Sequence, residues 1–385
     1  MIAVIADDFT GAAEIGGLGL LYGYKTAIVT KVNALENIDL LIIATEMRAF
    51  DSEKAVQESE KITKELLKLN PEFIYKKIDS VLRGNIGVEI KAQLKASEKS
   101  RALVVPANPI LNRIINNGIY YIDGKPLIES KFVNDLVFKA KSSKVLDIIG
   151  RTDDLSITSV SHNVKLPEKG LLIGNTLNMN DLKEWAKKID AETLPSGGAG
   201  FFDAILEKRS NIKQNYDDTS FDDNKNLLYV CGSNFPISKQ AVLDARAKGH
   251  VVVSMPDSIY NNRLYNQELI DQWSDEIIQK YKSNKKIIIS VLQQPGINTI
   301  RGWQIKNILG LLVKSILNTI AIDELFIEGG STAYIITQKL EINAFFPIQS
   351  IAPGVARMRV ENKKGLCLTV KPGSYVWPKS IWKFN

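Results

Sequence analysis

The sequence is poor in the residues that build most metal and redox sites. It contains only two cysteines and two histidines, so we expect neither a zinc site of the usual cysteine spacing nor a histidine-rich metal site. Cys231 and Cys367 both lie in apolar segments, which favours buried free thiols over a disulfide. The Walker A motif, the HRD and DFG motifs of protein kinases and the G-x-S-x-G nucleophile elbow are also absent.

Extremes of charge and hydropathy are lacking as well. The chain has 49 basic and 43 acidic residues without a basic block, so we expect no nucleic-acid partner. No apolar segment approaches the roughly 20 residues of a membrane span, and Met1 leads directly into a strand-like segment instead of a secretory leader. We therefore expect a cytoplasmic protein with small-molecule partners and no membrane partner, and leave open whether it forms a homodimer.

Most of the sequence alternates between apolar, strand-like segments and amphipathic, helix-like ones. This alternation predicts βαβ units and the α/β class, with largely parallel sheets. With 385 residues the chain is longer than a domain with a single hydrophobic core usually is. A polar, acidic segment over residues 210–226 predicts the boundary between two domains, 1–215 and 216–385. We expect strands at 2–6, 25–30, 39–44, 72–76, 101–105, 171–174, 227–231, 250–253, 286–291 and 324–327, and helices at 52–69, 85–94, 180–188 and about 298–318.

The first nineteen residues place two adjacent carboxylates where a strand leads into a helix. Asp7 and Asp8 follow the strand at 2–6, and open α/β sheets bind ligands at the carboxyl ends of their strands. Two such charges about 4 Å apart repel by roughly 4 kcal/mol at an effective dielectric of 20. A helix N-terminus stabilises each carboxylate by only about 0.3–1 kcal/mol, which does not offset this repulsion. We therefore expect a cation, a donor-rich ligand or a shared proton. The turn suits polyol hydroxyls or a metal ion, and the alternative is a plain helix cap with one exposed neighbour.

Two further segments should reach the same edge of the sheet. Arg48 follows the strand at 39–44, and Lys77 and Arg83 follow the next strand, so three cations would oppose the two acids. Because guanidinium groups bind carboxylates bidentately, this mixture fits a small hydroxylated acid; a surface ion-pair network is the alternative. Arg113, in the loop after residues 101–105, either closes over an anion or is solvated. The other polar or small members of these segments are Asp79, Ser80, Gly84 and Asn85.

Turns rich in glycine and serine in the second half point to phosphate binding. CGSNFPISKQ (231–240) and GGST (329–332) each join a strand to a helix, and free amides at such a helix start favour a phosphate. PGV (353–355) and KPGSY (371–375) are two further small-residue turns. Each turn alone is common, but together they predict a nucleotide-phosphate site.

The motifs together resemble the four-carbon acid sugar kinase family. IADDFTGAAE, RAF at Arg48, KIDSVLRGNIG, PANP with Arg113, GGAG, GSNFPISKQ, GGSTA, PGV and KPGSY occur in the family's order between residues 3 and 375. The resemblance implies an N-terminal domain for the sugar acid, a C-terminal domain for the nucleotide and a ligand cleft between them. It also implies ATP-dependent phosphorylation, with Mg²⁺, of the terminal hydroxyl of a threonate, erythronate or 3-oxo-tetronate type of acid. Val81 stands where the family usually has threonine, and Ser331 where it usually has glutamate.

The resemblance and the placement of charges give a set of expected site residues. We expect Asp8, or else Asp7 or Asp79, to accept the proton, and Lys77 or Arg83 to neutralise the phosphoryl group as the domains close. Two other activities stay open: a non-catalytic binding relative, and an ATP-dependent ligase that activates the carboxylate. The expected substrate-binding residues are Asp7, Asp8, Arg48, Asp79, Ser80, Val81, Leu82, Arg83, Gly84 and Arg113, and the expected ATP-binding residues are Ser233, Gly329, Gly330, Ser331, Thr332, Gly354 and Gly373.

Overall fold

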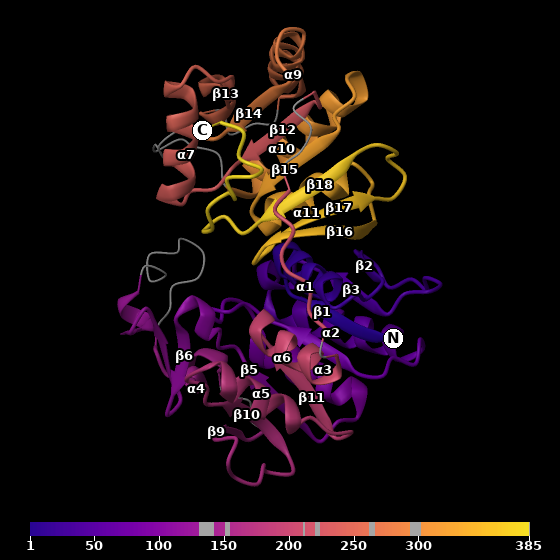
Figure 1. Cartoon of the computed structure of the whole chain (residues 1–385), viewed down its shortest axis with the longest axis vertical. Helices are drawn as coiled ribbons and strands as arrows, with labels where there is room; N and C mark the ends of the chain where they lie inside the picture. The colour runs from indigo at the N-terminus through magenta and orange to yellow at the C-terminus, as the bar shows by residue number, and fades with distance from the viewer. Residues whose placement is uncertain are drawn as a thin grey trace. The chain divides into compact units, whose positions relative to one another are not determined.

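A computed structural model describes residues 1–130, 142–150, 155–210, 212–219, 224–261, 266–292 and 302–384. The chain separates into two compact units, Met1–Gln214 and Asn215–Asn385, which Figure 1 colours from indigo to magenta and from magenta-orange to yellow. In each unit most neighbouring strands are parallel and are accompanied by helices, which confirms the predicted α/β class with two domains.

The sheet of the first unit brings three strand ends to one edge. Its order is β2-β3-β1-β4-β11-β5-β10-β9, and the neighbouring strands are parallel. In this register Ala6, the last residue of β1, lies beside Ala44 on one side and Lys77 on the other. The strands are β1 (Ile2–Ala6), β2 (Thr26–Val29), β3 (Leu40–Ala44), β4 (Ile74–Lys77), β5 (Arg101–Val105), β9 (Ile157–Val160), β10 (Gly170–Gly174) and β11 (Thr193–Gly197).

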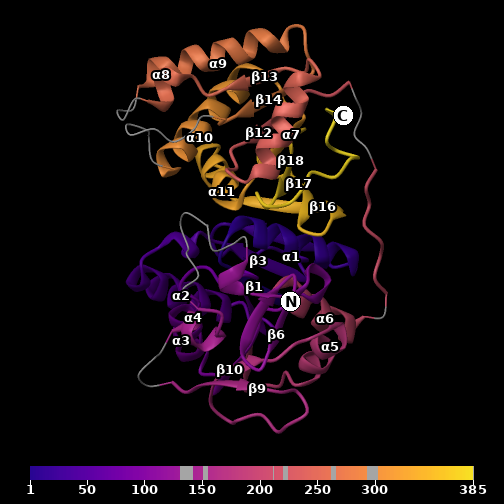
Figure 2. The same cartoon turned by 90° about the vertical axis from the view of Figure 1, so that its left-hand side faces the viewer.

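Helices pack in two groups on this sheet. α2 and α3 contact each other, as do α5 and α6, and α1 contacts α6 (Figure 2). This grouping follows from right-handed crossovers, because the chain moves one way across the sheet through α1 and α5 and the other way through α2 and α3. The helices are α1 (Phe9–Leu21), α2 (Ser52–Leu67), α3 (Ile86–Ser97), α4 (Val145–Ile149), α5 (Met179–Lys187) and α6 (Ala199–Arg209).

A small antiparallel sheet, β6-β7-β8, accompanies the first unit. It lies in the segment after β5, and Tyr120 and Ile122 of its middle strand are buried in the hydrophobic core. Its strands are β6 (Arg113–Asn116), β7 (Ile119–Ile122) and β8 (Lys125–Pro126), and the 3₁₀ turns of the unit are η1 (Met47–Ala49), η2 (Pro109–Leu111) and η3 (Leu127–Glu129).

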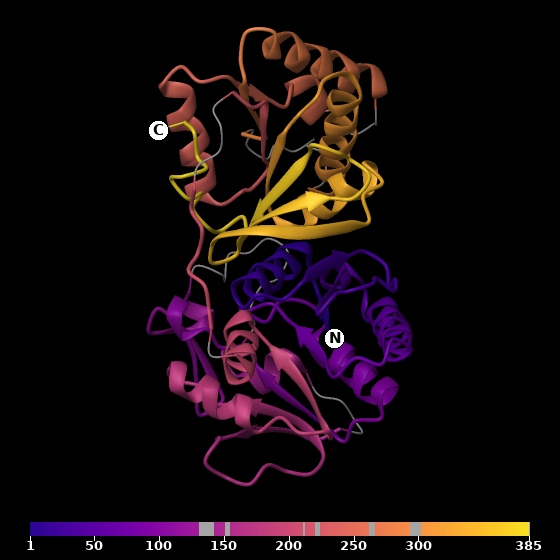
Figure 3. The same cartoon turned by 45° about the vertical axis from the view of Figure 1, so that its right-hand side comes forward.

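The second unit has a sheet of order β13-β14-β12-β15-β18-β17-β16. The pairs from β13 to β18 are parallel, whereas β16, β17 and β18 pair antiparallel (Figure 3). The strands are β12 (Leu227–Cys231), β13 (Val252–Ser254), β14 (Lys286–Ser290), β15 (Glu324–Glu328), β16 (Ala344–Ala352), β17 (Val355–Val360) and β18 (Cys367–Lys371), and the helices are α7 (Pro236–Ala247), α8 (Asp257–Tyr260), α9 (Gln267–Tyr281), α10 (Gly302–Thr319) and α11 (Gly330–Lys339).

The structure contains the helices and strands predicted from the sequence and adds several others. The predicted strands and helices are present with ends shifted by up to three residues; for the helix predicted at 298–318, residues 298–301 lie outside the described part. Besides the small antiparallel sheet, the elements that the sequence does not predict are strands β9, β11 and β16–β18 and helices α4, α6, α8 and α9. Cys231 and Cys367 are free thiols, and no helix among the described residues is both long and apolar enough to span a membrane.

Gly197 closes β11 against β5 so tightly that a side chain there should destabilise the first unit. A Cβ atom at Gly197 would lie 2.2 Å from the carbonyl oxygen of Val105, so Gly197→Ala forces a backbone shift that we expect to cost about 1–3 kcal/mol. The measurement is urea unfolding. Gly302→Ala is the control, because a Cβ there meets nothing within 4 Å and should change stability by under about 0.5 kcal/mol. Equal midpoints for the two variants would contradict the prediction.

Candidate active site

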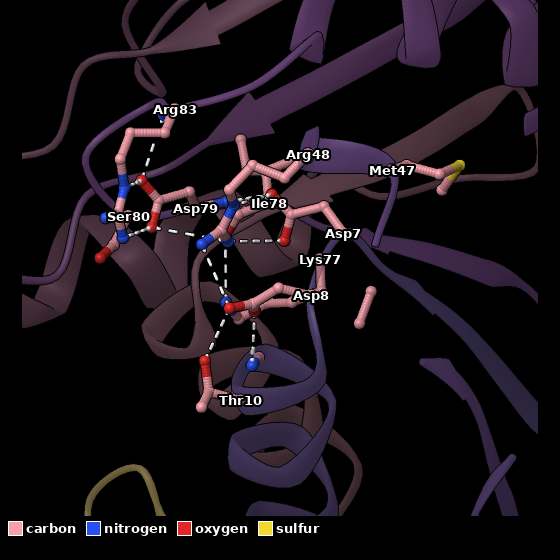
Figure 4. A network of polar contacts seen from close by, with 12 residues as sticks. Asp7, Asp8, Thr10, Met47, Arg48, Lys77, Ile78, Asp79, Ser80 and Arg83 are labelled. Carbon is pink, nitrogen blue, oxygen red and sulfur yellow. Dashed lines mark hydrogen bonds and ion pairs between the residues drawn. The ribbon is translucent and has the colours of Figure 1, made fainter. Parts of the chain in front are cut away.

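Three aspartates and two arginines gather at the carboxyl ends of β1, β3 and β4 (Figure 4). Asp7 and Asp8 directly follow β1, Arg48 lies in the 3₁₀ turn η1 after β3, and Asp79 and Arg83 follow β4. The three aspartates are 2%, 8% and 6% exposed in that order. A cluster of charges with so little water around it requires an internal balance.

Arg48 provides that balance as a counter-ion shared by the three aspartates. Its Nε and Nη2 donate to the two oxygens of Asp7 at 3.2 and 2.9 Å, and its Nη1 donates to Oδ2 of Asp8 at 3.1 Å. Nη2 also lies 3.6 Å from Oδ1 of Asp79. The cation expected from the repulsion of adjacent carboxylates is therefore a guanidinium group of the chain itself.

Asp8 also caps helix α1. Its Oδ1 accepts a hydrogen bond from the backbone N–H of Gly11 at 2.7 Å, and its Oδ2 accepts one from the hydroxyl of Thr10 at 2.7 Å. Gly11 permits this approach, because a Cβ atom there would lie 2.8 Å from Asp8 Oδ1 and 3.2 Å from Lys77 Nζ. The two interpretations of the acidic turn, helix cap and charged site, thus apply to the same carboxylate.

Asp79 is fixed by the turn that follows β4. It accepts hydrogen bonds from the backbone N–H, Nε and Nη2 of Arg83 at 3.1, 2.7 and 3.0 Å, and its own N–H donates to Oδ2 of Asp7 at 3.1 Å. The turn passes through Gly84 at φ +98°, where a Cβ atom would lie 3.1 Å from Cγ of Arg48. The turn therefore closes directly onto Arg48.

The three carboxyl groups have different acidities although they share counter-ions. Burial would raise the pKa of Asp79, but the charges of Arg83 and Arg48 outweigh burial and hold it far below the ordinary value. Burial acts on Asp8 in the same way, and Arg48, Lys77 and the bonds from Thr10 and Gly11 lower its pKa overall. For Asp7, burial prevails over Arg48 and the pKa is raised.

Lys77 and Arg113 lie beside this cluster and bind other groups. Lys77, 3% exposed, donates from Nζ to the carbonyl oxygen of Ile78 at 3.0 Å and lies 3.5 Å from Oε2 of Glu14. Arg113 donates to the hydroxyl of Ser80. Lys77 acts on Asp8 through its charge, and Arg113 positions the turn after β4.

The rest of that turn is anchored in the hydrophobic core. Val81 and Leu82 are buried among the apolar side chains of the first unit, so a substrate would meet their backbone before their side chains. Tyr120 donates to the carbonyl oxygen of Ser80. Sequence reasoning missed this contact. The IYYI sequence of β7 favours a strand but does not indicate this hydrogen-bond partner.

Four turns at the carboxyl edge of the second sheet carry the residues expected to bind the nucleotide. Ser233, after β12, donates to the carbonyl oxygen of Gly373 at 3.2 Å, and a Cβ atom at Gly373 would lie 2.7 Å from the Ser233 hydroxyl. Gly329, at φ +91°, opens helix α11, in which Gly330 and Thr332 are buried and Ser331 is partly exposed. Gly354 forms the tip of the β16–β17 hairpin.

The backbone N–H groups and small residues of these turns suit the binding of a phosphate group. The start of a ten-residue helix presents backbone N–H groups to an anion, and the small residues at Gly232 and Gly329 leave space around the Thr332 hydroxyl, 3.9 and 3.8 Å from where their Cβ atoms would be. No group of three or more His, Cys, Asp or Glu residues within the described ranges could hold a metal ion.

Comparison with known protein families agrees with the division into two units. The model of a sugar-binding N-terminal domain matches residues 2–205, and that of a nucleotide-binding C-terminal domain matches residues 228–375. The chain belongs to the four-carbon acid sugar kinase family. Membership confirms the resemblance inferred from the motifs, and it leaves the roles of individual residues as predictions.

Relatives within the family carry names of three kinds of kinase. The chain is 24% identical to a 3-oxo-tetronate kinase of Brucella melitensis, over 97% of the chain and 92% of the relative. It is 31% identical to a D-threonate kinase of Salmonella typhimurium over 41% of the chain and 38% of that protein. It is 33% identical to a D-erythronate kinase of Heliobacterium modesticaldum over 49% of the chain and 44% of that protein.

Solved structures of family-like proteins share the fold. A Salmonella typhimurium LT2 protein, provisionally described as a tRNA synthase, superposes with a TM-score of 0.77 at 19% identity over 97% of this chain and 96% of that one. Protein HI1011 of Haemophilus influenzae superposes with a TM-score of 0.71 at 20% identity over 98% of both chains. At these identities the likeness concerns the fold alone.

The acidity of Asp79 gives a pH-dependent prediction for this family member. Because its pKa in the folded protein lies below the ordinary 3.8, its ion pairs stabilise the fold above that pH and lose their effect as the pH falls through the lowered value. Asp79→Asn should therefore lower the free energy of unfolding by about 3 kcal/mol at pH 7, and the difference from wild type should narrow below about pH 4.

The control is Asp190→Asn, which removes a half-exposed carboxylate paired with Arg101 and should cost under about 1 kcal/mol. Chemical unfolding between pH 3 and pH 8 provides the measurement. A loss at Asp79→Asn that stays constant over this range would contradict the assignment of the ion pair.

Proposed function

We propose that this chain transfers the γ-phosphoryl group of ATP to the terminal hydroxyl of a four-carbon sugar acid. The observation that carries the proposal is the cluster of Asp7, Asp8, Arg48, Asp79 and Arg83 at one edge of the sugar-binding unit, in a chain whose other unit matches a nucleotide-binding domain. Relatives named as 3-oxo-tetronate, D-threonate and D-erythronate kinases support the same class of acceptor.

The cluster can recognise both ends of a small hydroxy acid. Arg83 has the most exposed side chain of the group, at 25% against 14% for Arg48, and its positive charge can attract a substrate carboxylate. Asp7 and Asp8 can accept hydrogen bonds from hydroxyl groups. Ser80, held by Arg113 and Tyr120, would add a hydroxyl donor beside them.

Asp8 is the aspartate best suited to accept the proton of the attacking hydroxyl. Asp7 is bound through both oxygens by Arg48, and Asp79 through both oxygens by Arg83. Both oxygens of Asp8 also accept hydrogen bonds, from Gly11, Thr10 and Arg48, but Asp8 is the most exposed of the three aspartates. Its lowered pKa keeps it ionised at neutral pH. A weak base suffices, because phosphoryl transfer depends mainly on positioning and charge neutralisation.

The second unit would hold the triphosphate at the turns around Gly329–Thr332, Ser233, Gly354 and Gly373. Mg²⁺ would enter with the nucleotide and offset the charge of its phosphate oxygens. Lys77 would add positive charge near the acceptor hydroxyl. Transfer requires the γ-phosphoryl group and the acceptor hydroxyl to meet.

The direct test measures ADP release from MgATP with a panel of D- and L-threonate, D- and L-erythronate, their 3-oxo forms and longer aldonates. We expect at least one four-carbon acid to give turnover and the longer aldonates to give little. Thermal stabilisation by ATP without ADP release from any acid would support a binding protein, and an acyl phosphate trapped by hydroxylamine would support a ligase. Either result would refute the kinase.

Asp8→Asn tests the proton acceptor. The amide cannot accept the proton, so we expect kcat to fall by about 10²–10⁴ with ATP binding kept. The matched control is Asp51→Asn, because Asp51 caps α2 as Asp8 caps α1, accepting from the N–H of Lys54 at 2.8 Å, and it should keep wild-type kcat. Near-normal turnover in Asp8→Asn with intact substrate binding would remove Asp8 from this role.

A further inference from the structure

A buried ion pair joins the ends of two strands beneath the proposed nucleotide turns. Glu328 is the last residue of β15 and Lys371 the last residue of β18, and the two lie opposite each other in the parallel register. Their residues are 2% and 0% exposed, and Lys371 Nζ lies 2.7 Å from Glu328 Oε1. Glu328 directly precedes Gly329, and Lys371 precedes Gly373 by two residues.

The second oxygen of Glu328 connects this pair to a third element. The hydroxyl of Ser238, in the first turn of α7, donates to Oε2 of Glu328. In the backbone, the N–H of Gly329 donates to the carbonyl oxygen of Lys371 at 2.9 Å. One carboxylate therefore ties together the ends of β15 and β18 and the start of α7, and the three turns that follow β12, β15 and β18 rest on these elements.

Lys371 begins the KPGSY turn, but its ammonium group is paired inside the protein. Besides Glu328 Oε1, Nζ donates to the carbonyl oxygen of Pro372 at 3.2 Å and lies 5.0 Å from the centre of the Trp377 ring. An ammonium group has three N–H donors, and an aromatic face within about 6 Å attracts a cation. A fully buried ammonium group with these neighbours is directed into the protein.

We infer that Glu328, Lys371 and Ser238 are positioning residues for the nucleotide site. They hold the Gly329–Thr332 turn, the Gly373 turn and the Ser233 turn at fixed separations without touching the nucleotide themselves. The inference rests on the proposed binding of ATP by the second unit. It assigns a role to three residues outside the expected ATP-binding set.

The close packing of the turns explains why their separation matters. Ser233 touches Gly373, where even a Cβ atom would lie 2.7 Å from the Ser233 hydroxyl oxygen. A small displacement of the end of β18 therefore moves both residues.

The carboxylate of Glu328 alone would repel phosphate groups nearby, and the charge of Lys371 cancels this repulsion. A buried pair is weak support for stability, because desolvation offsets much of its attraction.

The inference is tested by measuring the dissociation constant of MgATP, which needs no knowledge of the acceptor, together with the melting temperature. Glu328→Gln and Lys371→Met should each weaken MgATP binding by about tenfold or more, and Ser238→Ala, which keeps the ion pair intact, by about threefold. If Lys371 were instead a direct phosphate ligand, Glu328→Gln would release it from its competitor and tighten binding. Tighter binding in Glu328→Gln would overturn the inference.

Glu324→Gln is the matched control for a loss of stability. Glu324 is the first residue of the same strand, 1% exposed, and is paired with Arg357 and Lys225. We expect it to lower the melting temperature about as much as Glu328→Gln while MgATP binding stays within about twofold of wild type. Equal weakening in both glutamate variants would reduce the pair to a structural role and overturn the inference.

Ser238→Ala keeps the test decisive if the charge variants fail to fold, because unchanged binding in this variant contradicts the inference by itself. Wild-type protein that does not bind MgATP would instead refute the proposed function, and the inference with it. Wild-type binding with unchanged affinity in the folded variants would refute the inference alone. The two failures are therefore distinguishable.

Discussion

The site of the first unit depends on the ion pairs that the guanidinium group of Arg48 forms with three aspartates. Two consecutive aspartates and a third from the next strand come together with little water, and their mutual repulsion would open the turn without a cation. Arg48 contacts both oxygens of Asp7 and one of Asp8, and approaches Asp79. Gly84 is the complementary requirement, since it lets the turn after β4 pass directly over the arginine.

This arrangement links local helix chemistry to the properties of the site. Asp8 caps α1 and also faces Arg48, so the geometry of the cluster is fixed by the same bonds that begin the helix. The different acidities of Asp7 and Asp8, which are neighbours in sequence, follow from how each carboxylate is held. Burial dominates for the first, and the surrounding donors dominate for the second.

The periodicity of the sequence sufficed to predict the parallel core, because buried parallel strands such as β1, β3 and β12 are continuous apolar segments. It failed for β11, whose sequence TLPSG contains proline and glycine and reads as a turn, and for β16–β18, which follow no strand–helix alternation. Arg48 and Asp79 could be placed near Asp7 from strand ends alone. The partners of Lys77 and Lys371 could not, because pairing with Glu14 and Glu328 depends on side-chain packing that spacing does not encode.

Each unit contains a buried lysine at the end of a strand, and the two lysines have matching surroundings. Lys77 ends β4 and Lys371 ends β18, and each donates its ammonium group to the carbonyl oxygen of the following residue and lies near a glutamate. Both are almost fully removed from water. Mobile ions screen charges in solvent but reach buried pairs much less. The turns that these lysines hold should therefore keep their electrostatic balance across the range of ionic strengths that a cell meets, while the charges on the surface of the protein do not.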